Sequence, residues 1–148
     1  TARPASIPAH PLLSKLVLVP LFQQPAGCPR FIEDVRRNKV LLENAMDVDM
    51  AVQGTVRVLN MDYHKSVLIR YSYDNWQTFR DLHASYVPNS CDGFSDKFSF
   101  TIYAHFLVEG QKLSFAVCFR CLGQEFWDSN AGRNYTFHCY RKPLLPKT

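Results

Sequence analysis

The chain has 148 residues, a length typical of a single domain that can bury a hydrophobic core. Hydrophobic residues make up 47% of it and aromatic residues 14%, which excludes a disordered chain. No apolar run approaches the roughly 18 residues that span a membrane. The net charge of +4 is mild and its charges are scattered, so neither nucleic acid nor membrane is expected as a partner.

Residues 1–30 are expected to form a Pro-rich lead. Its prolines are Pro4, Pro8, Pro11, Pro20, Pro25 and Pro29. Because Pro has no backbone donor and a fixed φ, neither a central strand nor a helix is predicted here. The apolar segment Leu16–Phe22 is expected to pack against the domain as an extended arm. The chain starts at Thr1 with no signal peptide pattern, so we expect a piece of a longer protein.

Residues 31–142 are expected to form one β domain, followed by a tail at 143–148. Short apolar runs separated by turn residues occur at Val40–Met46, Thr55–Leu59, Ser66–Tyr73, Phe98–Phe106, Lys112–Arg120, Gln124–Trp127 and Tyr135–Tyr140. Several alternate with period two, and none shows a 3.6-residue apolar stripe of helical length. The pattern predicts an all-β fold, an antiparallel β-sandwich of about eight strands with an extended Pro-rich N-terminal arm and no helix longer than a couple of turns.

The cysteines do not form a recognisable disulfide or zinc pattern. They are Cys28, Cys91, Cys118, Cys121 and Cys139, an odd number with irregular spacing. Cys118 and Cys121 form a CxxC, but no second pair stands at zinc-finger distance, and the surrounding residues alternate like a strand. We therefore expect reduced thiols and a cytoplasmic protein.

The segment Phe126–Tyr135, FWDSNAGRNY, combines two large rings with a cluster of turn-forming residues. Asp, Asn and Gly tolerate left-handed backbone, so a loop is predicted. A ring beside such a loop can stack on a sugar face while the polar side chains bond its hydroxyls. The alternative interpretation is a hairpin loop in which Trp127 is a core residue and the Asn residues only fold the turn.

A second cluster of this kind lies in Tyr71–Tyr86, where Asp74 and Asn75 precede Trp76. Trp76 and Trp127 are the only tryptophans of the chain, and both stand in turn context. Loops at one end of a sandwich come together even when they are far apart in sequence. The two indoles are therefore predicted to form one stacking platform.

Catalytic and metal sites find little support in the sequence. Glu125 and Asp128 are the best carboxylate pair for a glycosidase, but Asp128 can equally cap the turn and Glu125 can be a solvated strand residue. The five histidines show no HxH or HExxH spacing, and no Gly-rich phosphate loop occurs. No enzyme activity, cofactor or metal is expected.

The ordered motifs GTVRVLNMDYHKSVLIRYSYDNW, DGFSDKFSF and FWDSNAGRNY resemble carbohydrate-binding module family 21, and more closely its form in the glycogen-targeting regulatory subunits of protein phosphatase 1. The matching positions are Phe22–Pro25 (FxQP), Val40–Glu43 (VxLE), Val58–Asn60 (VxN), Asp74–Trp76 (DxW) and Trp127–Tyr135 (WDNNxGxNY). The resemblance covers Leu21 to Tyr140, and the combination in this order is specific.

This resemblance implies an immunoglobulin-like β-sandwich that binds glycogen and related α-1,4-glucans without catalysis. Trp76 and Trp127 match the sugar-stacking positions, and Asp128, Asn130 and Asn134 match polar positions that contact sugar hydroxyls. Gly132 serves the turn, as is usual for this residue. Where the family usually has Asn, this chain has Ser129, so a weakened or water-mediated contact is expected there.

The resemblance also implies protein partners. The last motif, through Trp127, Asp128, Asn130, Asn134 and Tyr135, is a possible docking site for glycogen synthase or phosphorylase-type substrates of the phosphatase. The subunits bind the phosphatase catalytic subunit through an R/K-V-x-F segment. Lys65–Ile69 is the nearest match, but it ends in Ile and lies within a predicted strand, so the docking segment is expected upstream of Thr1. The resemblance also implies that the protein lies on glycogen particles in the cytoplasm.

One alternative function remains open from the sequence. The same aromatic loop can belong to a protein-interaction β-sandwich that docks a protein rather than a glucan. Sedimentation with glycogen or amylose, and competition by β-cyclodextrin, separate the two hypotheses.

Overall fold

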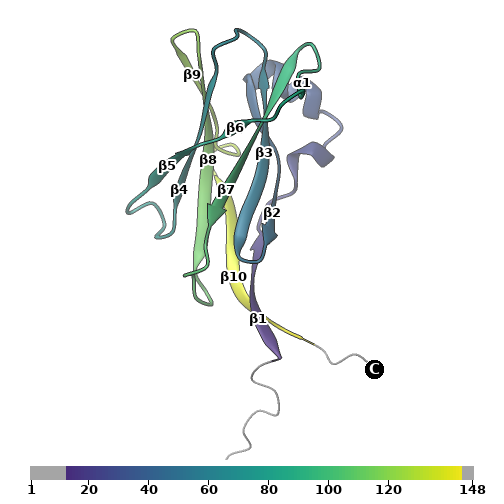
Figure 1. Ribbon diagram of the computed structural model, residues 1–148. Coiled ribbons are helices and arrows are strands. Elements are labelled where there is room, and N and C mark those ends of the chain that lie inside the picture. Colours follow the sequence, from purple (N-terminus) through teal and green to yellow (C-terminus); the bar gives the residue numbers. More distant parts are fainter. Residues whose placement is uncertain (1–12, 145–148) are drawn as a thin grey trace, which may run out of the picture.

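The computed structural model describes residues 13–144 and shows two antiparallel β-sheets packed face to face (Figure 1). The strands are β1 (Ser14–Pro20), β2 (Val40–Val48), β3 (Ala51–Leu59), β4 (Ser66–Ser72), β5 (Arg80–His83), β6 (Ser85–Tyr86), β7 (Ser95–Tyr103), β8 (Lys112–Cys121), β9 (Gln124–Asp128) and β10 (Tyr135–Pro143). A 3₁₀ turn, η1 (Pro25–Gly27), and a short helix, α1 (Phe31–Asn38), complete this part of the chain. Neither has the length of a membrane-spanning helix.

The larger sheet has the strand order β1-β10-β8-β4-β5, with β9 also paired to β8. The smaller sheet has the order β2-β3-β7-β6. Residues of alternate positions in both sheets fill a continuous core, among them Val56, Ile69, Phe115, Phe119 and Phe137, each of which is almost completely inaccessible to solvent. The antiparallel β-sandwich predicted from the alternation, with the immunoglobulin-like form implied by the resemblance, is therefore confirmed.

The strand count differs from the prediction because two short strands were missed. β5 has 4 residues and β6 has 2, and nearly all of them are exposed. Such strands carry no buried alternation, so the period-two pattern does not reveal them. They nevertheless matter, because β5 extends the larger sheet and β6 extends the smaller one (Figure 1).

Residues Ser14–Pro20, which overlap the segment expected to pack as an extended arm, form the edge strand β1 of the larger sheet. Its pairing with β10 runs from Ser14 opposite Pro143 to Pro20 opposite Phe137. An edge position suits a strand that ends on a proline, because the missing donor breaks no ladder bond on the outer side. The domain boundary at residue 30 stays a prediction, and residues 1–12, with most of the Pro-rich lead, lie outside the described part of the chain.

The FxQP motif anchors this N-terminal segment to the sandwich. The Phe22 ring contacts Tyr135 edge-on at a centroid distance of 5.0 Å. The Gln24 side chain donates to the Ala45 carbonyl at 2.7 Å and accepts from the Ala45 N–H at 2.9 Å. Because β2 is an edge strand, these bonds satisfy backbone groups that no neighbouring strand could reach.

The helix α1 was not predicted because its apolar face is too short to give a stripe. Phe31 and Val35 are its buried residues, one turn apart. Glu33 and Asp34 stand in the first turn and two arginines in the last, which complements the helix dipole. At 8 residues it respects the predicted limit of a couple of turns.

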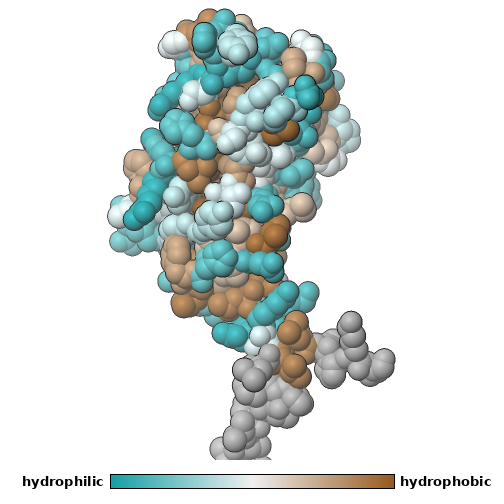
Figure 2. All heavy atoms as spheres, viewed as in Figure 1, coloured by the Kyte–Doolittle hydropathy of each residue, from teal (hydrophilic) through white to brown (hydrophobic). Residues whose placement is uncertain are grey.

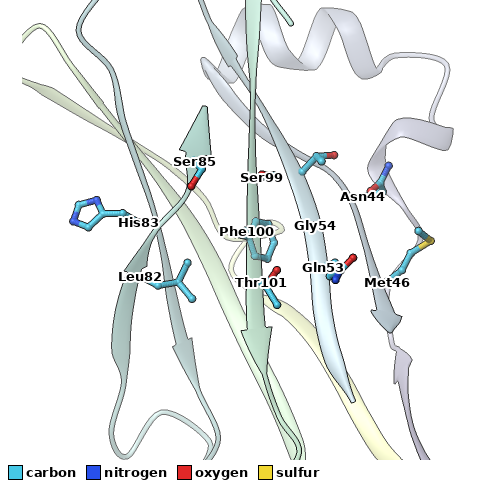
Figure 3. A pocket seen from close by; sticks show the side chains of 11 residues that line it. Asn44, Met46, Gln53, Gly54, Leu82, His83, Ser85, Ser99, Phe100 and Thr101 are labelled. Carbon is cyan, nitrogen blue, oxygen red and sulfur yellow. The ribbon is translucent and has the colours of Figure 1, made fainter. Parts of the chain in front are cut away.

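Gly54 on β3 makes room for the ring of Phe100 on β7, to which it is paired (Figure 3). A Cβ on Gly54 would lie 2.4 Å from Cζ of Phe100 and 2.9 Å from the Asn44 carbonyl oxygen. The pairing of β2 with β3 also shifts register between Leu42 and Asn44. The close approach of these atoms explains why a glycine occupies the middle of a strand.

The surface seen in Figure 2 is largely hydrophilic in its upper part and more apolar at its lower end. The loop that joins β7 to β8 lies at this end and carries the exposed side chains of Phe106 and Val108, next to Tyr103 at the end of β7.

Candidate functional site

The alternation of β9 decides which side chains of the last motif reach the surface. Trp127 is paired with Cys118 and points, like it, to the outer face of the larger sheet. Phe126 packs on the core and Asp128 is buried, so both point inward. The Trp127 side chain is 36% exposed, which excludes the alternative that it is a core residue.

Trp76 and Trp127 line the same shallow hollow, which has a volume of about 350 Å³ on the outer face of the larger sheet. The other lining residues are Arg70, Ala116, Ser129 and Asn134. Arg70 and Ala116 are opposite each other on β4 and β8 and form the floor. The structure therefore brings together the two tryptophans that lie far apart in the sequence.

The indole of Trp127 is held at its edge by Glu125. Its Nε1–H donates to Oε1 of Glu125 at 2.8 Å, and the Arg120 guanidinium Nε donates to Oε2 of the same carboxylate at 2.9 Å. The hydrogen bond from Trp127, together with that from Arg120, lowers the pKa of Glu125. The carboxylate thus stays ionised and keeps the indole in one orientation at neutral pH.

Arg70 holds the same indole from its face. The guanidinium carbon of Arg70 lies 5.2 Å from the Trp127 ring centroid and 4.3 Å from that of Phe79. Its Nε and Nη2 donate to the two carboxylate oxygens of Asp81 on β5, at 2.9 and 3.0 Å. This hydrogen-bonded pairing lowers the pKa of Asp81. Arg70 is therefore fixed in the hollow, with its charge balanced.

The Trp76 loop, which follows β4, has a strained backbone that hydrogen bonds keep in place. Asn75 and Trp76 both adopt left-handed conformations, with φ of 57° and 70°. The Ser72 hydroxyl accepts from the Trp76 N–H at 2.9 Å, and the Asp74 carboxylate accepts from both the N–H and the hydroxyl of Thr78. A left-handed Trp costs on the order of 1 to 3 kcal/mol, and such strain is concentrated at functional sites.

Asp128 is turned into the fold rather than toward the hollow. Its Oδ2 accepts from the Tyr135 hydroxyl at 2.6 Å and the Leu42 N–H at 2.8 Å, and its Oδ1 accepts from the Asn130 N–H at 3.1 Å. Burial raises the pKa of Asp128 despite these bonds. Burial is also the larger cause that raises the pKa of the Tyr135 hydroxyl, and the charge of the adjacent Asp128 raises it further. The sugar contact expected for Asp128 stays a prediction, while its observed bonds tie the loop to β2 and β10.

The loop that follows β9 presents Asn134 to the hollow. The Asn130 amide donates to the Asn134 carbonyl at 3.0 Å, and the Asn134 N–H donates to the Ser129 carbonyl at 2.7 Å. Gly132 is left-handed, with φ of 87°, and donates to the Ser129 hydroxyl at 3.2 Å. Among residues 13–144 the side-chain amide of Asn134 has no hydrogen-bond partner. It is therefore available to a ligand.

Glu125 and Asp128, the carboxylates considered for glycosidase chemistry, do not face each other. Glu125 is exposed on the outer face with Trp127, whereas Asp128 is 8% exposed and bonded inside the sandwich.

A larger hollow of about 610 Å³ lies across β2, β3, β7 and the β5–β6 segment (Figure 3). Its lining includes small polar side chains such as Gln53, Ser99 and Thr101, and no tryptophan.

Sequence reasoning missed Arg70, Phe79 and Asp81 as parts of the site. Arg70 could have been placed on the outer face, because it alternates with the buried Val67 and Ile69. No signal in the sequence showed that β5 pairs with β4 and brings Asp81 opposite Arg70.

Comparison with known proteins agrees with this geometry. The family described as carbohydrate/starch-binding module (family 21) matches residues 34–138. The chain is 54% identical over 129 residues to glycogen-binding subunit 76A of Drosophila melanogaster, covering 85% of this chain and 19% of that protein. It is 38% identical over 135 residues to human protein phosphatase 1 regulatory subunit 3A, covering 88% of this chain and 12% of that protein.

A solved structure supports the same relationship. The solution structure of the carbohydrate binding module of the muscle glycogen-targeting subunit of protein phosphatase-1 superposes with a TM-score of 0.72 at 38% identity, covering 86% of this chain and 95% of that one. The chain thus spans one module-sized part of much longer relatives. The matched residues, the identities and the shared fold together show that this chain belongs to carbohydrate-binding module family 21.

Proposed function

We propose that this module binds glycogen and related α-1,4-glucans at the hollow lined by Trp76 and Trp127. The observation that carries the proposal is that two indoles, Trp76 in the loop after β4 and the 36% exposed Trp127 on β9, line a single hollow beside the Asn134 side-chain amide, which has no hydrogen-bond partner among residues 13–144. A glucose ring has an apolar face and a rim of hydroxyls. Indoles match the apolar face with rigid area, and Asn134 matches the rim with a donor and an acceptor.

The residues of the last motif then divide into two roles. Trp127 and Asn134 contact the glucan, with Ser129 at the border of the hollow and Asn130 holding Asn134 in place. Asp128 and the buried Tyr135 act through the loop, because their mutual hydrogen bond fixes where the loop leaves β9 and enters β10.

The wider role follows from the relatives. Those described above are a glycogen-binding subunit and a regulatory subunit of protein phosphatase 1. By analogy the module brings the phosphatase catalytic subunit to glycogen particles in the cytoplasm, without catalysis of its own. The last motif, with Trp127, Asp128, Asn130, Asn134 and Tyr135, is proposed to dock glycogen synthase or phosphorylase-type substrates as well.

Sedimentation of the purified chain with glycogen tests this function. The parent chain is expected to pellet with glycogen and to be released by β-cyclodextrin. Trp127→Ala is expected to stay in the supernatant. Tyr103→Ala is a matched control, because Tyr103 is a 65% exposed ring on the smaller sheet, outside the hollow. A parent chain that neither pellets nor responds to β-cyclodextrin would refute the glucan assignment and favour a protein as the ligand of the aromatic loop.

A further inference from the structure

A second hollow adjoins the one that holds the tryptophans, on the same face of the larger sheet. It has a volume of about 700 Å³ and is lined by Leu21, Phe22, Gln23, Lys112, Asn130, Arg133, Asn134 and Thr136. Asn134 lines both hollows, so they meet at its side chain. The role proposed above for the tryptophan hollow does not account for this second space.

The strand register places both hollows on one continuous surface. On β8, the outward positions are Lys112, Ser114 and Ala116, because Leu113 and Phe115 between them are fully buried. Ala116 lies in the first hollow and Lys112 in the second. Four strand residues span about 13 Å, a distance that exceeds one sugar ring.

Between these two positions the surface stays polar. Ser114 is paired with Thr136 of β10, and their hydroxyls lie 2.9 Å apart. Neither residue carries a bulky side chain that would divide the surface. A chain leaving the tryptophans past Asn134 therefore meets a row of hydroxyl and amide groups.

The second hollow offers hydrogen-bond donors to a hydroxyl-rich ligand. Within residues 13–144 the side chains of Gln23 and Lys112 have no hydrogen-bond or ion-pair partner, and Arg133 makes a single long bond from Nε to the Asn130 carbonyl, at 3.5 Å. Leu21 is 58% exposed at the border and offers an apolar surface. Donors around an exposed apolar side chain are the combination that recognises a sugar ring.

We propose that this second hollow is an additional glucan subsite, which takes the continuation of an α-1,4-glucan chain whose first units stack on Trp76 and Trp127. The inference rests on the function proposed for the tryptophan hollow. Its consequence is a preference for chain length. A short oligosaccharide fills only the tryptophan hollow, whereas a longer one also bonds to Gln23, Lys112 and Arg133.

Calorimetric titration with maltotriose and with maltoheptaose tests the proposal. The parent chain is expected to bind maltoheptaose about tenfold more tightly, a difference of about 1.4 kcal/mol, because the longer sugar forms two or three additional hydrogen bonds at an exposed site. The double variant Lys112→Ala with Arg133→Ala is expected to lose most of this preference. Its affinity for maltotriose should stay within about twofold of the parent value.

A control variant removes two positive charges at another place on the same sheet. Lys15 and Lys142 face each other on β1 and β10, away from both hollows. The double variant Lys15→Ala with Lys142→Ala is expected to keep the preference of the parent chain. In NMR spectra of isotope-labelled protein, the backbone amide signals of Gln23 and Thr136 should change chemical shift when maltoheptaose is added but not when maltotriose is added.

The outcomes separate the two proposals. If the parent chain binds both sugars and the Lys112/Arg133 variant keeps the same ratio of affinities, the second subsite is wrong while the tryptophan site stands. A parent chain that binds both sugars equally well leads to the same conclusion. If neither sugar binds the parent chain, the proposed glucan function itself fails.

Discussion

The guanidinium carbon of Arg70 lies 5.2 Å from the centre of the Trp127 ring, and the two side chains come from strands on either side of β8. Asp81 keeps Arg70 in this position by a two-pronged ion pair. Glu125 bonds the indole N–H from the other direction. The Trp127 ring, which is proposed to stack on a sugar, is thus held in one orientation before a ligand arrives, which would lower the entropic cost of binding.

Arg70→Gln is expected to weaken glycogen binding about threefold to tenfold. An exposed cation–π contact contributes about 0.5–1 kcal/mol, and an exposed ion pair a similar amount or less, so the fold should lose little stability. In a Trp76→Phe background, Trp127 is the only tryptophan, and its fluorescence should show greater mobility in the Arg70 variant. Arg36→Gln is the control, because Arg36 covers the Phe94 ring at 4.4 Å outside the hollow. Unchanged binding in the Arg70 variant would show that Trp127 needs no such support.

Truncation of either tryptophan is expected to abolish most binding while the domain stays folded. A contact of roughly 100 Å² at about 25 cal/mol per Å² gives on the order of 2 to 3 kcal/mol, or roughly 30- to 100-fold in affinity. Trp127 is 36% exposed and Trp76 is half-buried, so neither change opens a core cavity. Sedimentation with glycogen and thermal unfolding of Trp76→Ala and Trp127→Ala measure the two effects. A melting temperature of both variants well below that of the parent chain would show that the tryptophans stabilise the fold instead.

Asp128→Ala is expected to lower the free energy of unfolding by about 2 to 6 kcal/mol. The Tyr135 hydroxyl and the Leu42 N–H both donate to its Oδ2 in a buried place, and each would lose its acceptor at a cost of about 1–3 kcal/mol. Tyr135→Phe removes one of these donors and should cost only about 1 kcal/mol. Urea unfolding compares the two variants. Full stability of Asp128→Ala with lost glycogen binding would instead support the direct sugar contact expected from the motif.

Gly54→Ala is expected to destabilise the sandwich by about 1–3 kcal/mol through overpacking. The added Cβ would meet the Phe100 ring at 2.4 Å and the Asn44 carbonyl at 2.9 Å, and both belong to paired strands. Gly27→Ala is the control, since nothing lies within 4 Å of its Cβ position. Thermal unfolding of the two variants should differ clearly, and equal melting temperatures would mean that the Phe100 ring relocates at little cost.

All five thiols are free, as the sequence predicted. Cys28 and Cys91 are exposed, whereas Cys118, Cys121 and Cys139 are buried. Burial raises the pKa of all three buried thiols, that of Cys118 to about 11, so they should react slowly with a thiol reagent at neutral pH. We expect two fast-reacting thiols in the folded protein and five in denaturant without reductant. A total of one or three in denaturant would reveal disulfides.

The alternation of apolar and polar residues was enough to predict the sandwich and most of its strands, because a side chain's face depends only on its parity along a strand. The same rule places Trp127 outward once Phe126 is taken as a core residue. Helix α1 was not predicted, because two apolar positions in 8 residues give too short an apolar stripe to recognise in the sequence. The strands β5 and β6 were not predicted because their side chains are exposed.

The composition of the hollow was decided by tertiary structure. Arg70, Trp76 and Trp127 meet only because β4, β8 and β9 are neighbours, and strand order is not written in local periodicity. Asp128 belongs to a motif whose residue types suggest sugar contacts, yet its carboxylate accepts from Leu42, which is 86 positions away in the sequence. A local pattern shows which groups can bond. Packing decides which partner each one meets, because a buried carboxylate must bond to donors that distant strands bring within reach.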